Sequence, residues 1–149
     1  MQVWVDADAC PGEIKELLFR AAKRTQIKVT LVANQLMYTP KSNYIDSILV
    51  PAGMNVADRR IVELTEPGDL VVTADIPLAA DVVAKGGQAL NPRGELYTDG
   101  NVGERLAVRN MLDDLRGGGQ IAGGPSNFNA KDKQAFANQL DRWLTKAKR

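Results

Sequence analysis

Short apolar runs alternate along the chain with segments in which apolar residues recur every three or four positions. The short runs predict buried strands, and the wider spacing predicts helices with one apolar face. The predicted strands cover residues 2–6, 27–33, 47–50, 69–74 and 88–90. The predicted helices cover residues 11–24, 56–65, 77–85 and 101–116, and a last one runs from about residue 129 into a basic tail.

This alternation of strands and helices predicts the fold class. The strands are apolar on both faces, which is typical of parallel sheets with helices on both sides. We therefore expect a three-layer α/β/α fold with a mostly parallel central sheet of four to five strands. The 149 residues suit one domain, 1–149. Long loops are predicted at 34–46 and, because of its many glycines, at 117–127.

Composition restricts the chemistry that the protein can perform. The chain has no histidine and a single cysteine, Cys10. Histidine-based acid–base catalysis, His-ligated zinc and an internal disulfide are therefore excluded. The net charge of +1 provides no global basic field that would indicate nucleic acid. No secretory signal and no membrane-spanning apolar stretch is visible, so we expect a cytoplasmic protein without a membrane partner.

Two aspartates directly follow predicted strands. Asp6 ends the first apolar run, and Asp75 ends the segment 69–75. In parallel α/β sheets, binding sites form at the edge where the strands end. Asp6 and Asp75 are therefore candidates for one shared site at this carboxyl edge.

Two further aspartates are predicted at the same edge. Asp58 lies in the first turn of the helix 56–65 and shares a face with Ile61 and Val62, so its carboxylate should tilt toward the sheet. Asp8 follows Asp6 by two residues. If the chain stays extended between them, both side chains point to the same side.

Four converging carboxylates repel one another unless they are protonated or neutralised by a cation. Ligation by oxygen alone suits Mg²⁺ or Mn²⁺, and such an ion can polarise a phosphate and activate water. A structural interpretation stays open beside this one. Asp75 and Asp8 can cap the helices that follow them, and Asp58 suits the positive end of a helix dipole. Asp6 ends a buried strand and is less easily explained in this way.

Several strings of the sequence resemble one known family. They are V-W-V-D-A-D-A-C-P, N-V-A-D-R-R-I-V-E, G-D-L-V-V-T-A-D-I-P-L-A, N-P-R-G and a late G-G-P followed by F and K-D. These strings resemble the YaiI/YqxD family of uncharacterised bacterial proteins, and the resemblance runs nearly end to end. That family is in turn similar to the PIN-like nuclease superfamily.

The resemblance implies a parallel sheet whose acidic edge binds a divalent metal and cleaves phosphodiesters. The PIN-like acidic positions correspond to Asp6, Asp58 and Asp75 in this sequence. Asp8 belongs to the family's own motif and has no fixed counterpart in the general PIN-like pattern. Asp81 follows Asp75 by six residues, and whether it joins the site is open.

Three hypotheses on function follow. The first is a Mg²⁺- or Mn²⁺-dependent nuclease acting on RNA, with Asp6, Asp8, Asp58 and Asp75 as catalytic and metal-binding residues. Arg59, Arg93 and Lys41 are its candidate phosphate contacts, although scattered surface charges are the commoner explanation for such residues. The second is a haloacid-dehalogenase-type phosphatase that uses the D-x-D of the first strand. The third is a non-catalytic module that binds nucleic acid or a protein partner.

Overall fold

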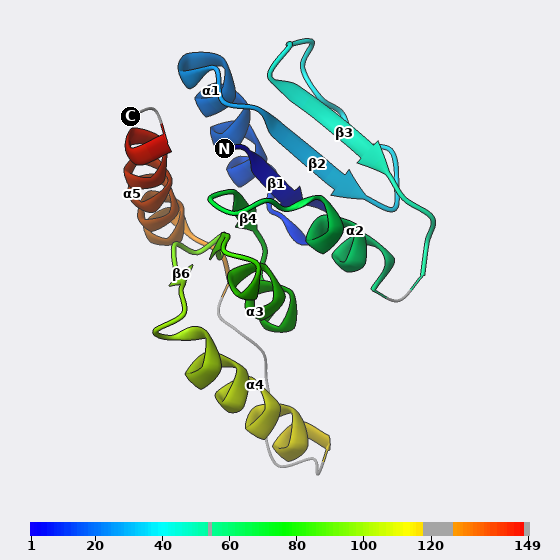
Figure 1. Ribbon diagram of the computed structural model, residues 1–149, viewed down its shortest axis with the longest axis vertical. Coiled ribbons are helices and arrows are strands. Elements are labelled where there is room, and N and C mark those ends of the chain that lie inside the picture. Colours follow the sequence, from blue (N-terminus) through cyan, green and yellow to red (C-terminus); the bar gives the residue numbers. More distant parts are fainter. Residues whose placement is uncertain (54, 118–126, 148–149) are drawn as a thin grey trace.

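The structure is a computed structural model that describes residues 1–53, 55–117 and 127–147, in which six strands form one sheet (Figure 1). The strands are β1 (Val3–Asp6), β2 (Val29–Ala33), β3 (Ile45–Leu49), β4 (Leu70–Val72), β5 (Gln88–Leu90) and β6 (Leu96–Tyr97). The helices are the short 3₁₀ turn η1 (Ala7–Ala9), α1 (Gly12–Thr25), α2 (Val56–Leu64), α3 (Ile76–Ala84), α4 (Val102–Gly117) and α5 (Ala130–Ala147).

The strand order places β1 in the middle of the sheet. The order is β3-β2-β1-β4-β5-β6, and every neighbouring pair is parallel except β5 and β6. The chain first builds outward from β1 to β3 and then crosses to the other side of β1 to form β4. In such sheets a crevice opens outside the carboxyl ends of the two strands where the direction of building reverses. Here those strands are β1 and β4.

Helices cover both faces of the sheet, which confirms the predicted three layers. On one face, Val3 and Val5 of β1 pack with apolar residues of α1 and α5. On the other face, Trp4 and Val71 pack with residues of α2 and α3. This division follows from the alternation of side chains along a strand. The mostly parallel sheet is likewise confirmed, with one strand more than the expected upper number.

Two strands, β3 and β6, illustrate where the structure departs from the prediction. β3 begins at Ile45, because the backbone pairing with β2 starts with the N–H of Val29 donating to the oxygen of Tyr44 at 2.8 Å. The loop predicted at 34–46 is shorter as a result. The sequence gives no sign of β6, since two residues are too few to show a periodic pattern. The core of the Gly-rich segment, 118–126, and the last two residues lie outside the described part of the chain.

The N-cap residues of α3 and α2 act in different ways. Asp75 is the N-cap of α3, and its Oδ1 accepts the Leu78 N–H at 3.0 Å. Asn55 occupies the N-cap position of α2 with φ of 62° and makes no capping bond with its side chain. Asparagine tolerates left-handed backbone conformations and is used here for its backbone shape. Within residues 1–53, 55–117 and 127–147, none of the helices is long and apolar enough to cross a membrane.

Candidate functional site

Asp6 and Thr73 meet at the crevice between β1 and β4. Asp6 is only 9% exposed, and like Trp4 it points to the face of the sheet that α2 and α3 cover. The Thr73 hydroxyl donates to Oδ2 of Asp6 at 2.9 Å and accepts the backbone N–H of Asp75 at 3.0 Å. Burial raises the pKa of Asp6, the Thr73 bond opposes this rise, and repulsion from Asp75 and Asp8 adds to it. Thr73 thus links two candidate site residues.

Asp58 and Asp75 form a close acidic pair between α2 and α3. Burial is the main cause that raises the pKa of Asp58 to about 6. Repulsion from Asp75 and Asp6, a hydrogen bond to Asp75 and repulsion from Asp81 raise it further. One oxygen of Asp75 caps α3, so the same residue serves as a cap and as a partner of Asp58. The structural and functional interpretations of Asp75 are therefore compatible.

Asp8 takes a different direction from the one predicted. The chain does not stay extended through Ala7, because residues Ala7–Ala9 form η1. The Asp8 carboxylate accepts the Asn34 N–H at 2.9 Å and the side-chain amide of Gln35 at 3.4 Å. It makes no cap for α1, which begins after Pro11 without a side-chain capping bond. Asp8 therefore fastens the loop after β2, while lying near enough to raise the pKa of Asp6.

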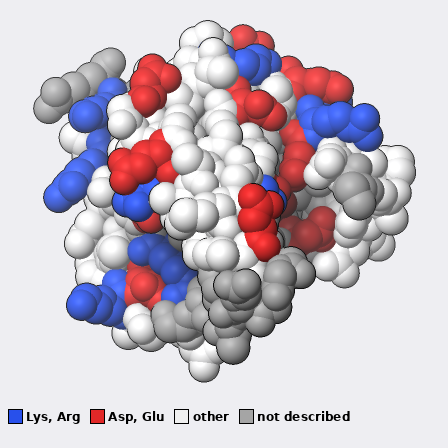
Figure 2. Space-filling model, turned by 90° about the horizontal axis from the view of Figure 1, so that it is seen from below, with Lys and Arg blue, Asp and Glu red and all other residues white. Residues whose placement is uncertain are grey.

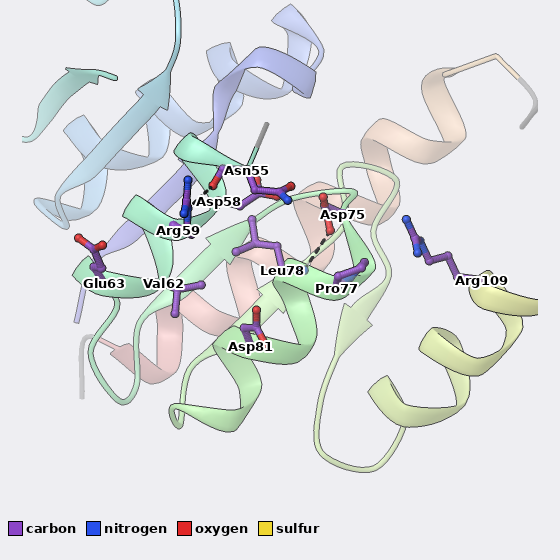
Figure 3. Close-up of a pocket in the computed structure, with 10 residues that line it drawn as sticks. All are labelled: Asn55, Asp58, Arg59, Val62, Glu63, Asp75, Pro77, Leu78, Asp81 and Arg109. Atoms are coloured by element: carbon purple, nitrogen blue, oxygen red, sulfur yellow. Dashed lines mark hydrogen bonds between the residues drawn. The ribbon is translucent and has the colours of Figure 1, made fainter. Parts of the chain in front are cut away.

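A pocket of about 680 Å³ opens beside the acidic pair (Figure 3). Asp58 and Arg59 line it from α2, Asp75 and Asp81 from the N-cap and the second turn of α3, and Arg109 from α4. Figure 2, seen from the side toward which β2 and β3 point in Figure 1, shows acidic side chains in and around a hollow of the surface. The pocket thus joins carboxylates with two guanidinium groups at the carboxyl edge of the sheet.

The three basic residues predicted from the sequence separate in the structure. Arg59 lines the pocket. Arg93 instead binds Oδ2 of Asp132 at 3.0 Å, beside Gly94, whose φ of 95° lets the turn press against Ala135. Lys41 is exposed and precedes β3 by four residues, toward the edge of the sheet at which the strands begin. Among these three, the structure brings only Arg59 to the acidic pair.

Two lining residues add to what the sequence predicted. Asp81, left open above, reaches the pocket from the second turn of α3. Arg109 was not among the candidates, because helix α4 shows no motif and lies far along the chain from Asp58. A pattern of local spacing cannot reveal that a later helix returns to the pocket. Only a co-variation of Arg109 with α2 or α3 would have provided such a signal.

The thiol of Cys10 is too buried to act as a nucleophile. Cys10 is 8% exposed, and burial raises the pKa of its thiol to about 12. The thiolate is the reactive form of cysteine, so a buried group with this pKa is inert. The chemistry of the site therefore falls to carboxylates, guanidinium groups and hydroxyls.

The acidic side chains fit a hard cation by their chemistry, since carboxylate oxygens are the ligands that Mg²⁺ and Mn²⁺ prefer. Their repulsion, visible in the raised pKa of Asp58, is the kind that a bound cation relieves. As the side chains stand, no three His, Cys, Asp or Glu residues of the described chain are grouped closely enough to hold an ion. The arrangement is a hydrogen-bonded pair with Asp6 close by.

Fold and site together define an α/β/α protein with a carboxylate-lined pocket at the crevice of a mostly parallel sheet. Residues 4–146 match the sequence model of a family described as uncharacterised bacterial proteins of the YaiI/YqxD family. The chain belongs to this family, which confirms the resemblance seen in its motifs.

The similar proteins are bacterial. A UPF0178 protein of Janthinobacterium sp. (strain Marseille) is 60% identical over 146 residues, which cover 98% of this chain and 97% of the relative. A UPF0178 protein of Pectobacterium atrosepticum is 57% identical over 149 residues, covering 100% of this chain and 99% of the relative. These names state no activity. No solved structure matches the chain significantly.

Proposed function

We propose that the protein is a Mg²⁺- or Mn²⁺-dependent phosphodiester hydrolase that acts on RNA. The observation that carries the proposal is the Asp58–Asp75 pair, placed with Asp6 where the sheet opens between β1 and β4. Burial and mutual repulsion hold a proton on Asp58 at a pH where an ordinary aspartate is ionised. Strongly shifted carboxylates in a pocket are typical of catalytic and metal-binding sites.

In this proposal, Asp6, Asp58 and Asp75 hold the metal. When bound, the ion would supply the positive charge that polarises the phosphodiester and lowers the pKa of an attacking water. The chain itself orients the ligands: Thr73 fixes Asp6, and the Leu78 N–H fixes one oxygen of Asp75. Arg59, at the rim of the same pocket, would bind a phosphate oxygen.

The similarity of the YaiI/YqxD family to PIN-like nucleases supports the same proposal. The three aspartates that correspond to the PIN-like acidic positions interact through their charges here, since both Asp75 and Asp6 raise the pKa of Asp58. Figure 3 shows Asp58 and Asp75 on neighbouring helices beside the pocket, although they lie 17 positions apart in the sequence.

The geometry favours a nuclease over a phosphatase of the D-x-D type. That phosphatase needs the second aspartate as acid–base beside the first. Asp8 instead accepts hydrogen bonds from Asn34 and Gln35 and serves the loop after β2. A non-catalytic binding module would bind no Mg²⁺ or Mn²⁺ in a calorimetric titration, which separates that hypothesis from the proposal.

The proposal is tested with a labelled RNA oligonucleotide, incubated with Mn²⁺ or Mg²⁺ and analysed for cleavage products. Asp75→Asn and Asp6→Asn should each lower the cleavage rate by about two orders of magnitude or more, because each removes a charged ligand. Asparagine is a good N-cap, so the first variant should keep α3 intact.

Asp141→Asn is the matched control, since Asp141 is exposed on α5 and pairs with Arg24 away from the pocket. It should cleave like the unaltered protein. An unchanged rate in Asp75→Asn, or no metal-dependent cleavage by the unaltered protein, would contradict the proposed function.

A further inference from the structure

Arg109 occupies the wall of the pocket that faces the acidic pair. It projects from the middle of α4, and Figure 3 shows its guanidinium directed toward Asp75 and Pro77 from the opposite side of the pocket. α4 follows β6 and extends away from the sheet in Figure 1. The pocket is therefore built from α2 and α3 on one side and from α4 on the other.

The first turns of α4 are held in place by several contacts. Val102 packs against the buried group that contains Ala79 and Val83 of α3. The side-chain amide of Asn101 donates to the oxygen of Leu96 at 2.8 Å, and Arg105 forms an ion pair with Glu95. Arg109 lies one turn beyond Arg105. The contacts of the first turns of α4 with α3 and β6 therefore position Arg109 at the pocket.

The pocket has an acidic side and two arginines that can offset its negative charge. Asp58, Asp75 and Asp81 make one side acidic, which repels a phosphodiester that approaches the pair. Among the lining residues, Arg59 and Arg109 supply the positive charge, from opposite walls. A guanidinium offers two parallel N–H donors to a phosphate, so two arginines can hold a polyanionic strand over an acidic site.

Two other arginines form ion pairs with acidic residues outside the pocket. Arg93 binds Asp132, and Arg105 binds Glu95. Arg59 reaches back toward the oxygen of Asn55 at 3.4 Å, so it belongs to α2 and approaches from the acidic side. Arg109 is the lining arginine that α4 contributes, and its guanidinium donates to Oδ1 of the neighbouring Asn110 at 3.3 Å.

We infer that Arg109 binds a backbone phosphate of the nucleic-acid substrate, opposite Arg59, so that the strand spans the pocket between α2 and α4. The inference rests on the proposed function only in taking a phosphodiester polymer as the ligand. It assigns to α4 a role in substrate binding, and Arg109 is a binding residue that leaves the chemical step to the aspartates.

The test measures the binding of a short fluorescein-labelled single-stranded RNA by anisotropy at low salt in EDTA, where metal-dependent cleavage is absent. Arg109→Ala should bind about tenfold more weakly, as expected for the loss of a charge-assisted contact. The slope of log affinity against log salt should fall by about 0.7, which corresponds to one phosphate contact on a single strand. Arg109→Lys keeps the charge without the paired donors and should recover part of the affinity.

Arg142→Ala is the matched control, because it removes the same charge from an exposed position of α5. It should keep the affinity and the salt slope of the unaltered protein. Equal affinity and slope in Arg109→Ala, or no RNA binding by the unaltered protein, would overturn the inference.

Cleavage assays keep the two proposals apart. With metal present, Arg109→Ala should raise KM about tenfold with little change in kcat, whereas Asp75→Asn should lower kcat. If Arg109→Ala alters neither binding nor KM while Asp75→Asn abolishes cleavage, only the role of Arg109 is lost. If RNA binds through Arg109 but no metal-dependent cleavage occurs, only the proposed hydrolase is lost.

Discussion

Aspartates at the two edges of the sheet have opposite surroundings. Asp69, just before β4, is 2% exposed and lies at the edge where the strands begin. Its oxygens accept the Gln2 N–H at 3.1 Å, the Trp4 indole N–H at 3.0 Å and the Glu66 N–H at 2.9 Å. At the other edge, Asp58 is repelled by neighbouring carboxylates. The pKa of Asp6 is raised there, although Asp6 accepts a hydrogen bond from Thr73.

This difference shows how the same residue type can serve structure or function. A buried carboxylate surrounded by three N–H donors has its charge satisfied by the fold itself. A carboxylate that meets other carboxylates is left with a charge that the fold does not satisfy. Such unsatisfied positions are where a ligand or a cation gains the most by binding. Asp69 therefore belongs to the fold, and the Asp58–Asp75 pair remains the candidate site.

The largest expected effect lies on the structural side. Asp69→Ala should lower the free energy of unfolding by about 3 kcal/mol, because one buried and two part-buried N–H donors lose their acceptor. Urea unfolding followed by circular dichroism measures this loss. Trp4→Phe removes one of the three bonds and should cost about 1 kcal/mol. A loss well below 1 kcal/mol in Asp69→Ala would contradict the structural role of Asp69.

A smaller effect should come from metal at the other edge. At ten times its dissociation constant, Mn²⁺ should stabilise the protein by about 1.4 kcal/mol, through preferential binding to the folded state. A rise in the melting temperature measures this. The rise should shrink in Asp75→Asn and persist in Asp141→Asn, whose position lies on α5. The same rise in all three proteins would place the cation away from the acidic pair.

The smallest effect concerns the dependence of stability on pH. The folded pKa of Asp58 is about 6, above the ordinary value of 3.8, so the folded state binds this proton more tightly than the unfolded state does. The stability that Asp58 contributes is therefore complete below pH 3.8 and is lost as the pH rises through about 6.

Asp58→Asn removes this ionisation. Above pH 6, the variant should melt on the order of a few degrees higher than the unaltered protein. The difference should fall steadily as the pH is lowered toward 3.8. Melting curves at a series of pH values measure it, with Asp141→Asn as the control that lacks such a trend. A difference independent of pH would show that Asp58 is not held protonated by its neighbours.

The sequence by itself determined the layers of the fold and the approximate position of the acidic edge. Strand and helix periods are local properties, so the apolar runs and the three-to-four spacing predicted most elements within a few residues. Because parallel strands end at one edge, Asp6 and Asp75 could be placed together from the pattern alone. The motifs also identified the family, which the match over residues 4–146 confirms.

Only the tertiary structure decided what each polar side chain contacts. Asp8 lies two residues from Asp6, yet η1 turns its side chain toward Asn34. Arg93 forms an ion pair with Asp132 in the first turn of α5. Arg109 comes to the pocket through the packing of α4 on α3. Each of these outcomes depends on contacts between residues that are distant in the sequence. Periodicity reports which side of an element is buried, but the partner on that side is fixed only when the elements pack together.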